Sequence, residues 1–166
     1  VVDKNVERVD FSSRPFKVWV EGEEFRAETV IISTGAEAIW LGAEGEQGQK
    51  GRGISTCATC DGAFFRGDEV IVVGGGDSAM EEATFLTRFA SKVTIIHRRD
   101  VFRASKVMLE RAKNHPKIEI RAHRQVKEWL SDDKGLTGAM LEDPRDGSLE
   151  KTETWNFERK TGNIYI

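Results

Sequence analysis

The first part of the chain alternates between apolar and polar residues, which is the pattern of β-strands. Residues 16–20 (FKVWV) predict one strand, because side chains two positions apart lie on the same face of a sheet. After a turn, residues 25–33 predict a second strand, and we expect its apolar run, residues 30–32, to form its buried core. Thr34 and Gly35 end this strand.

Residues 41–53 (LGAEGEQGQKGRG) are rich in glycine and charge and contain almost nothing to bury. Such a composition is typical of a linker, so we place the domain boundary here. The chain therefore divides into a strand segment at residues 1–40, a linker, and a second domain at residues 54–154. Residues 155–166 form a tail that no pattern assigns.

The second domain contains the pattern of a strand–helix–strand unit. Residues 69–73 (EVIVV) and 92–96 (KVTII) are short β-branched runs with turn residues beside them. Residues 77–90 between them predict a helix, because their apolar residues recur at helical spacing. A parallel crossover of this kind is right-handed in nearly all proteins.

Further elements extend the sheet. Residues 103–114 predict a second helix that a proline stops, and residues 118–121 predict a third strand. Residues 124–130 and 136–142 predict an antiparallel pair, with one more strand near residues 148–154. The predicted fold class is α/β, a Rossmann-like parallel sheet with an attached β-meander, flanked by the first strand segment.

The composition limits the location and the partners. Apolar residues make up 39% of the chain and charged residues 32%, as in ordinary globular proteins. With 25 Lys and Arg against 28 Asp and Glu, the formal charge of −3 gives no reason to expect nucleic acid or an anionic membrane as partner. The chain has no membrane-length apolar run, no signal peptide and only two cysteines, so we expect a cytoplasmic protein. Because it starts with Val1, we also expect a fragment of a longer chain.

A glycine-rich turn lies between the first strand of the second domain and its helix. It consists of Gly74, Gly75, Gly76, Asp77, Ser78 and Ala79, which fit the pattern G-x-G-x-x-A. We expect Gly74 to allow the tight turn, Gly76 to let a pyrophosphate approach, and Ala79 to let helix and strand pack closely. The pyrophosphate would lie at the helix N-terminus, where free N–H groups favour an anion. The alternative is a tight turn without a ligand.

The residues after the next strand indicate which dinucleotide is bound. An NAD site has Asp or Glu there, bonded to the ribose 2′-hydroxyl. Here basic residues follow instead: His97, Arg98, Arg99 and, slightly later, Arg103. Guanidinium groups bind a 2′-phosphate that a carboxylate would repel, so the sequence predicts NADP(H). The alternatives are a solvated basic loop and, for His97, a loop histidine without a ligand.

Cys57 and Cys60 form a C-x-x-C motif just ahead of the glycine-rich turn. Zinc needs four ligands, and the chain has neither a second cysteine pair nor closely spaced histidines, so we predict no metal site. In a cytosolic βαβ protein this spacing is typical of a redox-active pair, with an inert thiol pair as the alternative. Asp61 follows directly, and its carboxyl group is a candidate acid/base for dithiol chemistry. Its alternative role is to cap a helix or turn.

An NADPH site and a disulfide in one module are normally joined by a two-electron carrier, and a flavin is the usual one. FAD would need a dinucleotide cradle of its own. The sequence contains a single G-x-G-x-x-G/A turn, so we expect FAD in the complete enzyme but do not expect this chain alone to hold it firmly.

Four stretches in combination closely resemble the low-molecular-weight thioredoxin reductases of bacteria, archaea and plants. They are residues 33–35 (STG), 57–62 (CATCDG), 74–83 (GGGDSAMEEA) and 97–106 (HRRDVFRASK). The resemblance implies an FAD- and NADPH-dependent homodimeric enzyme that reduces the disulfide of thioredoxin. It also implies an NADPH domain that is inserted within the FAD domain and that rotates relative to it.

The resemblance further implies a role for each matching residue. Cys60 would meet the flavin, Cys57 would attack the disulfide of thioredoxin, and Asp61 would be the acid/base. The residues implied to contact the adenosine ribose and its 2′-phosphate are Ser78, Arg98, Arg99 and Arg103. Thr34 and Gly35 would lie where the FAD domain joins the NADPH domain.

By the same resemblance, residues 1–40 are a partial FAD-domain segment and residues 41–53 are the hinge linker. The family's N-terminal FAD fingerprint and C-terminal FAD contact are absent, and the tail does not resemble its return strand. Two other interpretations stay open: a stand-alone NADP-binding module without catalysis, and another flavin disulfide reductase such as a peroxiredoxin-reducing flavoprotein. Ala58 and Thr59 between the cysteines favour thioredoxin reductase over the latter.

Overall fold

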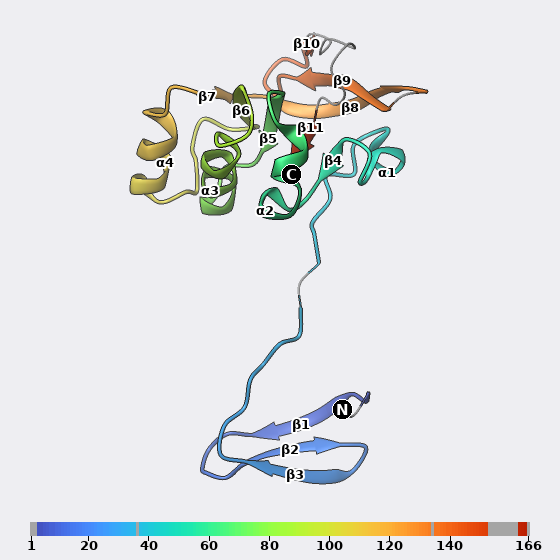
Figure 1. Cartoon of the computed structure of the whole chain (residues 1–166), viewed down its shortest axis with the longest axis vertical. Coiled ribbons are helices and arrows are strands. Elements are labelled where there is room, and N and C mark those ends of the chain that lie inside the picture. Colours follow the sequence, from blue (N-terminus) through green and yellow to red (C-terminus); the bar gives the residue numbers. More distant parts are fainter. Residues whose placement is uncertain (1–2, 36, 134, 153–162, 166) are drawn as a thin grey trace. The chain divides into compact units, whose positions relative to one another are not determined.

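The computed structural model describes residues 3–35, 37–133, 135–152 and 163–165, and the chain forms two compact units, Val1–Glu37 and Ala38–Ile166 (Figure 1). The first unit is an antiparallel sheet with the strand order β1-β2-β3. Its strands are β1 (Val6–Asp10), β2 (Phe16–Val20) and β3 (Glu23–Ala27). The prediction of a strand at residues 16–20 is confirmed.

The second predicted strand of this unit is shorter than expected. The ladder between β2 and β3 ends at the pair of Phe16 and Ala27, where β2 itself begins. Ile31 and Ile32 lie beyond that end, outside any strand, and are 92% and 72% exposed. The prediction that residues 30–32 form a buried strand core was therefore wrong. A β-branched run becomes a strand only where a partner offers backbone hydrogen bonds, and β2 offers none there.

The second unit is built on a five-stranded parallel sheet with the strand order β4-β11-β5-β6-β7. Its strands are β4 (Ile54–Ser55), β5 (Glu69–Val73), β6 (Lys92–His97), β7 (Ile118–Ala122) and β11 (Asn163–Tyr165). The helices of the unit are α1 (Glu46–Gln49), α2 (Ala58–Asp61), the 3-10 helix η1 (Gly62–Phe65), α3 (Asp77–Leu86) and α4 (Lys106–Lys113). The predicted strand–helix–strand unit is confirmed as β5, α3 and β6, although α3 ends before residue 90.

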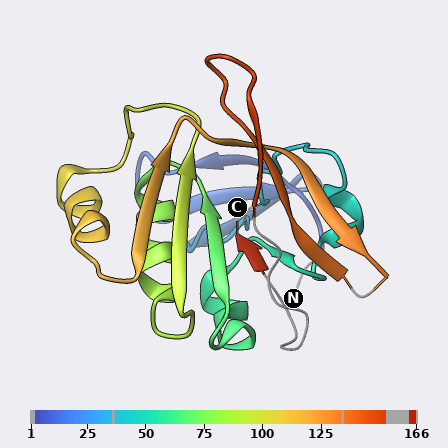
Figure 2. The same ribbon diagram turned by 90° about the horizontal axis from the view of Figure 1, so that it is seen from above.

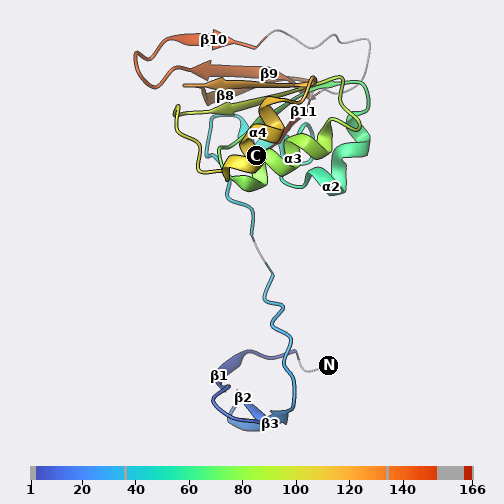
Figure 3. The same ribbon diagram turned by 90° about the vertical axis from the view of Figure 1, so that its left-hand side faces the viewer.

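A helical layer and a second sheet cover the two faces of the parallel sheet (Figure 3). The second sheet is antiparallel and consists of β8 (Gln125–Asp132), β9 (Gly135–Glu142) and β10 (Leu149–Lys151), which confirms the predicted β-meander. Successive side chains of β5 pack alternately against the helical layer and against the second sheet. Val70 and Val72 pack with Met80 of α3, whereas Ile71 packs with Trp129 of β8. Each layer therefore has its own core against one face of the sheet.

Residues 41–53, predicted as a linker, pack within the second unit. They contain α1, whose Glu46 is buried. The backbone N–H of Trp129 on β8 donates to the carbonyl oxygen of Glu44 over 2.8 Å. The boundary between the two units falls before residue 38 instead. Composition misled here because the polar groups of this segment bond to one another and to β8, so few apolar residues are needed to hold it.

The tail that no sequence pattern assigned contributes a strand to the middle of the parallel sheet. β11 (red in Figure 2) lies between β4 and β5 and pairs in parallel with both. Residues 153–162 and 166 lie outside the described residues. In the part of the chain that the structure describes, no helix is long and apolar enough to cross a membrane.

Candidate redox disulfide and dinucleotide pocket

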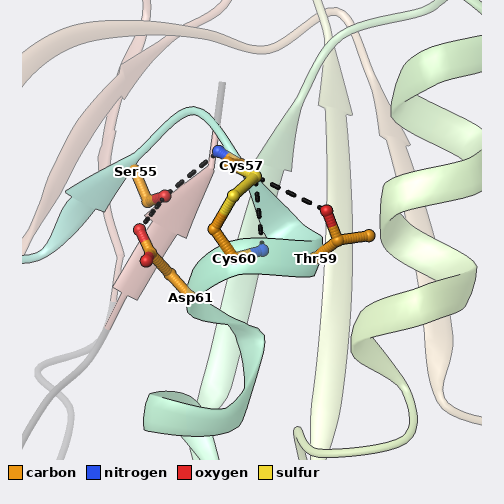
Figure 4. Close-up of a disulfide and its surroundings, with 5 residues drawn as sticks. All are labelled: Ser55, Cys57, Thr59, Cys60 and Asp61. Carbon is orange, nitrogen blue, oxygen red and sulfur yellow. Dashed lines mark hydrogen bonds between the residues drawn. A yellow bond between two sulfur atoms is a disulfide. The ribbon is translucent and has the colours of Figure 1, made fainter.

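Cys57 and Cys60 are joined by a disulfide bond at the start of α2, directly after β4 (Figure 4). The sulfur of Cys57 accepts a hydrogen bond from the backbone N–H of Cys60 over 3.2 Å. The hydroxyl oxygen of Thr59 lies 3.5 Å from the same sulfur. In the reduced protein, the same N–H and hydroxyl groups would favour a thiolate on Cys57.

The two cysteines differ in exposure. Cys60 is exposed at the surface, while Cys57 is only half-buried and lies closer to the end of β4. Neither cysteine residue is buried, so the pair lies at the surface, where a second molecule or group can approach it. This exposure argues against the alternative of a buried, inert pair, because inert structural thiols are buried.

Ser55 connects the disulfide to Asp61, and sequence reasoning missed it. The Ser55 hydroxyl group donates to Oδ2 of Asp61 over 2.6 Å, and its oxygen accepts the backbone N–H of Cys57 over 3.1 Å. Ser55 is only 7% exposed. Figure 4 shows the Asp61 carboxylate turned toward this hydroxyl group, beside the disulfide. The only sequence signal was a hydroxyl residue two positions before the first cysteine.

The glycine-rich turn connects β5 to the N-terminus of α3. Gly74 has a φ of +157°, and a Cβ there would lie 2.9 Å from the Cβ of Ala79, so the close approach of strand and helix requires glycine. Gly76 precedes the first residue of α3, and a Cβ at this position would meet no atom of the protein within 4 Å. The backbone of Gly76 therefore faces open space at a helix N-terminus, which suits a phosphate group.

Gly75 has a function that the motif alone does not show. A Cβ on Gly75 would lie 2.5 Å from Cε1 of His97, so the histidine ring packs directly on this glycine. The carbonyl oxygen of Gly75 accepts the backbone N–H groups of Arg103 and Ala104 over 2.7 and 3.0 Å. Gly75 thus anchors both ends of the basic loop after β6.

His97 is a part of this loop's framework. Its ring lies 4.9 Å from that of Phe102, and Nε2 lies 3.3 Å from the carbonyl oxygen of Val101. Burial lowers the pKa of His97 below its usual 6.5; the hydrogen bond to Val101 opposes this shift, and the charges of neighbouring arginines add to it. The lowered pKa of His97 favours the neutral ring at pH 7, so the positive charge of the basic loop comes mainly from its arginines.

Asp77 also holds the loop. Its Oδ1 accepts the backbone N–H of Ser105 over 2.6 Å, which ties the start of α3 to the segment before α4. Ser78 is exposed on the first turn of α3, next to the open side of Gly76.

A pocket of about 630 Å³ lies over the carboxyl ends of β5 and β6. Six of the residues predicted for the cofactor line it: Gly74, Gly75, His97, Arg98, Arg99 and Arg103. Its other lining residues were not predicted: Ile39, Trp40, Leu41, Val73, Ile96, Val101, Arg124, Gln125 and Val126. Their positions are separated by up to 87 residues in sequence, so no local pattern could have grouped them.

Three arginine side chains of this pocket can bind an anion. Arg98, Arg99 and Arg103 are exposed, and among the described residues none of them forms an ion pair. Arg124, by contrast, is engaged with Asp143 and Glu150. Thr34 and Gly35 lie in the first unit, in an exposed segment outside any helix or strand, and are not among the pocket residues.

The site fits NADP(H) and offers nothing comparable for FAD. Open space at Gly76 and unpaired guanidinium groups suit a pyrophosphate and a 2′-phosphate. The first unit, in the part that the structure describes, has three antiparallel strands and no strand-to-helix turn. Among the described residues, no group of three or more His, Cys, Asp or Glu could hold a metal ion.

A parallel sheet with a dinucleotide pocket and a disulfide defines the class of nucleotide-linked thiol-disulfide redox proteins. Residues 1–152 match the family model of the pyridine nucleotide-disulphide oxidoreductases, and the chain belongs to this family. The family uses FAD and NADPH.

Curated relatives and solved structures agree with this assignment. The chain is 50% identical to a thioredoxin reductase of Rickettsia felis over 145 residues, which cover 86% of this chain and 47% of that protein. It is 53% identical to one of Mycolicibacterium smegmatis over 140 residues, covering 84% and 45%. A solved thioredoxin reductase from Giardia duodenalis superposes with a TM-score of 0.80 at 40% identity, covering 98% of this chain and 51% of that one. The chain thus spans about half the length of the relatives that it matches.

Proposed function

We propose that this chain carries the NADPH-binding and dithiol half of a thioredoxin-disulfide reductase. One observation carries the proposal. The disulfide follows β4 and the glycine-rich turn follows β5, and both strands run parallel to β11 between them. The carboxyl ends of parallel strands meet at one edge of a sheet, which is where open α/β sheets bind their ligands. The electron donor and the disulfide thus share that edge.

The nucleotide is bound by residues with separate tasks. Arg98, Arg99 and Arg103 bind the 2′-phosphate by charge-assisted hydrogen bonds. Gly76 and the N-terminus of α3 receive the pyrophosphate, and Ser78 lies within reach of the ribose side of the turn. Gly75, His97 and Asp77 hold the basic loop in place, as their contacts support.

The dithiol transfers its electron pair by thiol-disulfide exchange. The thiolate of Cys57 attacks one sulfur of the thioredoxin disulfide, which forms a mixed disulfide and releases a thiolate on thioredoxin. The thiolate of Cys60 then attacks the sulfur of Cys57, which restores the Cys57–Cys60 disulfide and releases reduced thioredoxin. Two thiols of this chain are oxidised, and one disulfide of thioredoxin is reduced. The hydrogen bond from the Cys60 N–H to the Cys57 sulfur supports Cys57 as the attacking group.

Asp61 moves the protons that this exchange requires. A leaving thiolate takes up a proton when its pKa lies above the pH, and a thiol must lose one before it attacks. A carboxyl group beside the disulfide can carry that proton to and from water. Ser55 orients it, since its hydroxyl group is bonded to Asp61 and to the backbone of Cys57.

FAD supplies the two-electron step between NADPH and the disulfide when it is bound. The described residues hold no cradle for it, so this chain's own part is nucleotide binding and thiol exchange. We further propose a homodimer that acts in the cytoplasm, with Cys60 as the cysteine that faces the flavin. The similarity to thioredoxin reductases and the exposure of Cys60 support these points.

Trapping of a mixed disulfide tests the proposal on the chain itself. The Cys60→Ser variant is pre-reduced and incubated with oxidised thioredoxin, and products are separated on non-reducing gels and weighed as intact proteins. We expect a stable mixed disulfide through Cys57, because Cys60 is no longer there to resolve it. The Cys57→Ser variant is the matched control and should form far less. Equal trapping by both variants, or by neither, would overturn the cysteine roles.

A further inference from the structure

One part of the dinucleotide pocket is lined by a segment that belongs to no helix or strand. Ile39, Trp40 and Leu41 line the pocket together with the basic loop. Ile39 is 89% exposed and Leu41 is 43% exposed, although both are apolar. A planar ring that lies against them would remove this surface from water. We call residues 39–41 the apolar wall.

The apolar wall is held by a buried carboxylate. The backbone N–H of Leu41 donates to Oε1 of Glu46 over 3.1 Å, and that of Gly42 donates to Oε2 over 2.8 Å. Glu46 is only 2% exposed, and no ion pair to it exists among the described residues. A buried carboxylate is costly unless donors satisfy its oxygens. Both oxygens of Glu46 accept hydrogen bonds from backbone N–H groups, those of Leu41 and Gly42.

A second contact from the same short region acts on the wall. The ammonium group of Lys50, which follows α1, lies 3.8 Å from the ring centre of Trp40. Such a cation–π contact fixes the ring of an aromatic side chain. The wall has no ladder of its own, so its position depends on these two contacts and on the packing of Trp40 against the core that contains Ile71 and Trp129.

We propose that the apolar wall binds an aromatic ring of the dinucleotide and that Glu46 is the positioning residue that holds the wall in its binding geometry. This inference rests on the nucleotide site of the proposed function. Both the adenine and the nicotinamide of NADPH are planar rings that fit an apolar surface. The contacts of Glu46 with Leu41 and Gly42 distinguish it from a residue that only fills the core.

The test compares Glu46→Gln with Glu44→Gln in the 166-residue chain. The two changes remove the same charge two positions apart, but Glu44 is exposed. We expect Glu46→Gln to raise the Kd for NADPH about tenfold, as loss of a hydrogen bond to a charged group does, and Glu44→Gln to leave it within about twofold. The preference for NADPH over NADH should be unchanged, because the arginines are intact.

Adenosine 2′,5′-bisphosphate, which lacks the nicotinamide, identifies the ring. Equal weakening of this probe and of NADPH in Glu46→Gln supports adenine at the wall, and weakening of NADPH alone supports the nicotinamide. A merely structural role for Glu46 would lower the thermal midpoint of the free protein and leave both Kd values unchanged at temperatures where it is folded. That result would overturn the inference.

Ile39→Ser keeps the test decisive if Glu46→Gln does not fold. Ile39 is so exposed that its substitution leaves the fold intact, and Ile31→Ser, on an equally exposed residue of the first unit, is its control. We expect Ile39→Ser alone to weaken NADPH by about threefold or more. If both Ile39→Ser and any folded Glu46→Gln bind NADPH as tightly as the unmutated chain does, only this inference is overturned. Failure of the unmutated chain to bind NADPH would overturn the proposed function instead.

Discussion

Ser55 and Asp61 are joined by a 2.6 Å hydrogen bond beside the Cys57–Cys60 disulfide. The lone pair of the Ser55 oxygen receives the N–H of Cys57, so its own proton is directed to the carboxylate. One buried hydroxyl group thereby fixes the acid/base candidate and the first cysteine relative to each other. The geometry of the redox site therefore includes Ser55 as well as the cysteine motif.

Removal of this hydroxyl group should slow thiol exchange. We expect Ser55→Ala to reduce the rate at which dithiothreitol reduces the disulfide at pH 7 by about two- to tenfold, because Asp61 loses its donor and the Cys57 N–H loses its acceptor. Thiol release, followed by alkylation and mass spectrometry, measures the rate. Ser91→Ala, at an exposed serine before β6, is the control. An unchanged rate in Ser55→Ala would show that Asp61 needs no such orientation.

The arginines after β6 should decide between NADPH and NADH. We expect Arg98→Ala combined with Arg99→Ala to remove most of the preference for NADPH, on the order of 1–3 kcal/mol, because charge-assisted bonds to the 2′-phosphate are lost. Titration calorimetry with both nucleotides measures it. Arg111→Ala, on the exposed face of α4, is the control for net charge. Equal affinities for NADH and NADPH in the unmutated chain would rule out the 2′-phosphate site.

A substitution at Gly76 should weaken NADPH binding without lowering the stability of the protein. A Cβ at this position meets no protein atom within 4 Å, so Gly76→Ala should change the thermal midpoint by less than about 3 °C. The same methyl group occupies the space of the pyrophosphate and should weaken NADPH binding at least about tenfold. Gly48→Ala, in α1, also has no protein atom outside its own helix within 4 Å of its Cβ and should leave NADPH binding unchanged. Unchanged NADPH binding in Gly76→Ala would place the pyrophosphate elsewhere.

A substitution at Gly75, unlike one at Gly76, should lower stability as well as NADPH binding. Its Cβ would lie 2.5 Å from the ring of His97, so Gly75→Ala must displace the histidine and the loop behind it. We expect the free energy of unfolding to fall by roughly 1–3 kcal/mol, which lowers the thermal midpoint. NADPH binding should weaken as well, because the basic loop is displaced. Thermal unfolding followed by circular dichroism measures the first effect. An unchanged midpoint would contradict the packing of His97 on this glycine.

Asp143 should make the stability of the second unit depend on pH. Hydrogen bonds from Arg145 hold the pKa of Asp143 well below its usual value, and the charges of Arg145 and Arg124 add to this. A lowered carboxyl pKa stabilises the fold fully above the ordinary value of about 4, and this stabilisation is lost as the pH falls below it. The difference in thermal midpoint between the unmutated chain and Asp143→Asn should therefore shrink from pH 7 to pH 3. Asp133→Asn, in an exposed turn, is the control, and a constant difference would contradict the ion pairing.

Elements whose signals lie within a few neighbouring residues could be predicted from the sequence alone. The β-branched run of β5, the glycines after it and the helical spacing of α3 predicted a dinucleotide-binding unit, because strand, turn and helix propensities are local. The cysteine spacing predicted a redox pair for the same reason.

Features that depend on partners far along the chain became visible only in the folded structure. Three observations follow from which strand offers backbone hydrogen bonds. Ile31 and Ile32 are exposed, residues 41–53 pack within the second unit, and β11 lies inside the parallel sheet. The bond from Ser55 to Asp61 and the hold of Glu46 on the apolar wall arise because the chain turns back on itself there. A sequence pattern records which residues are apolar or charged, but the contacts that place them are made across the fold.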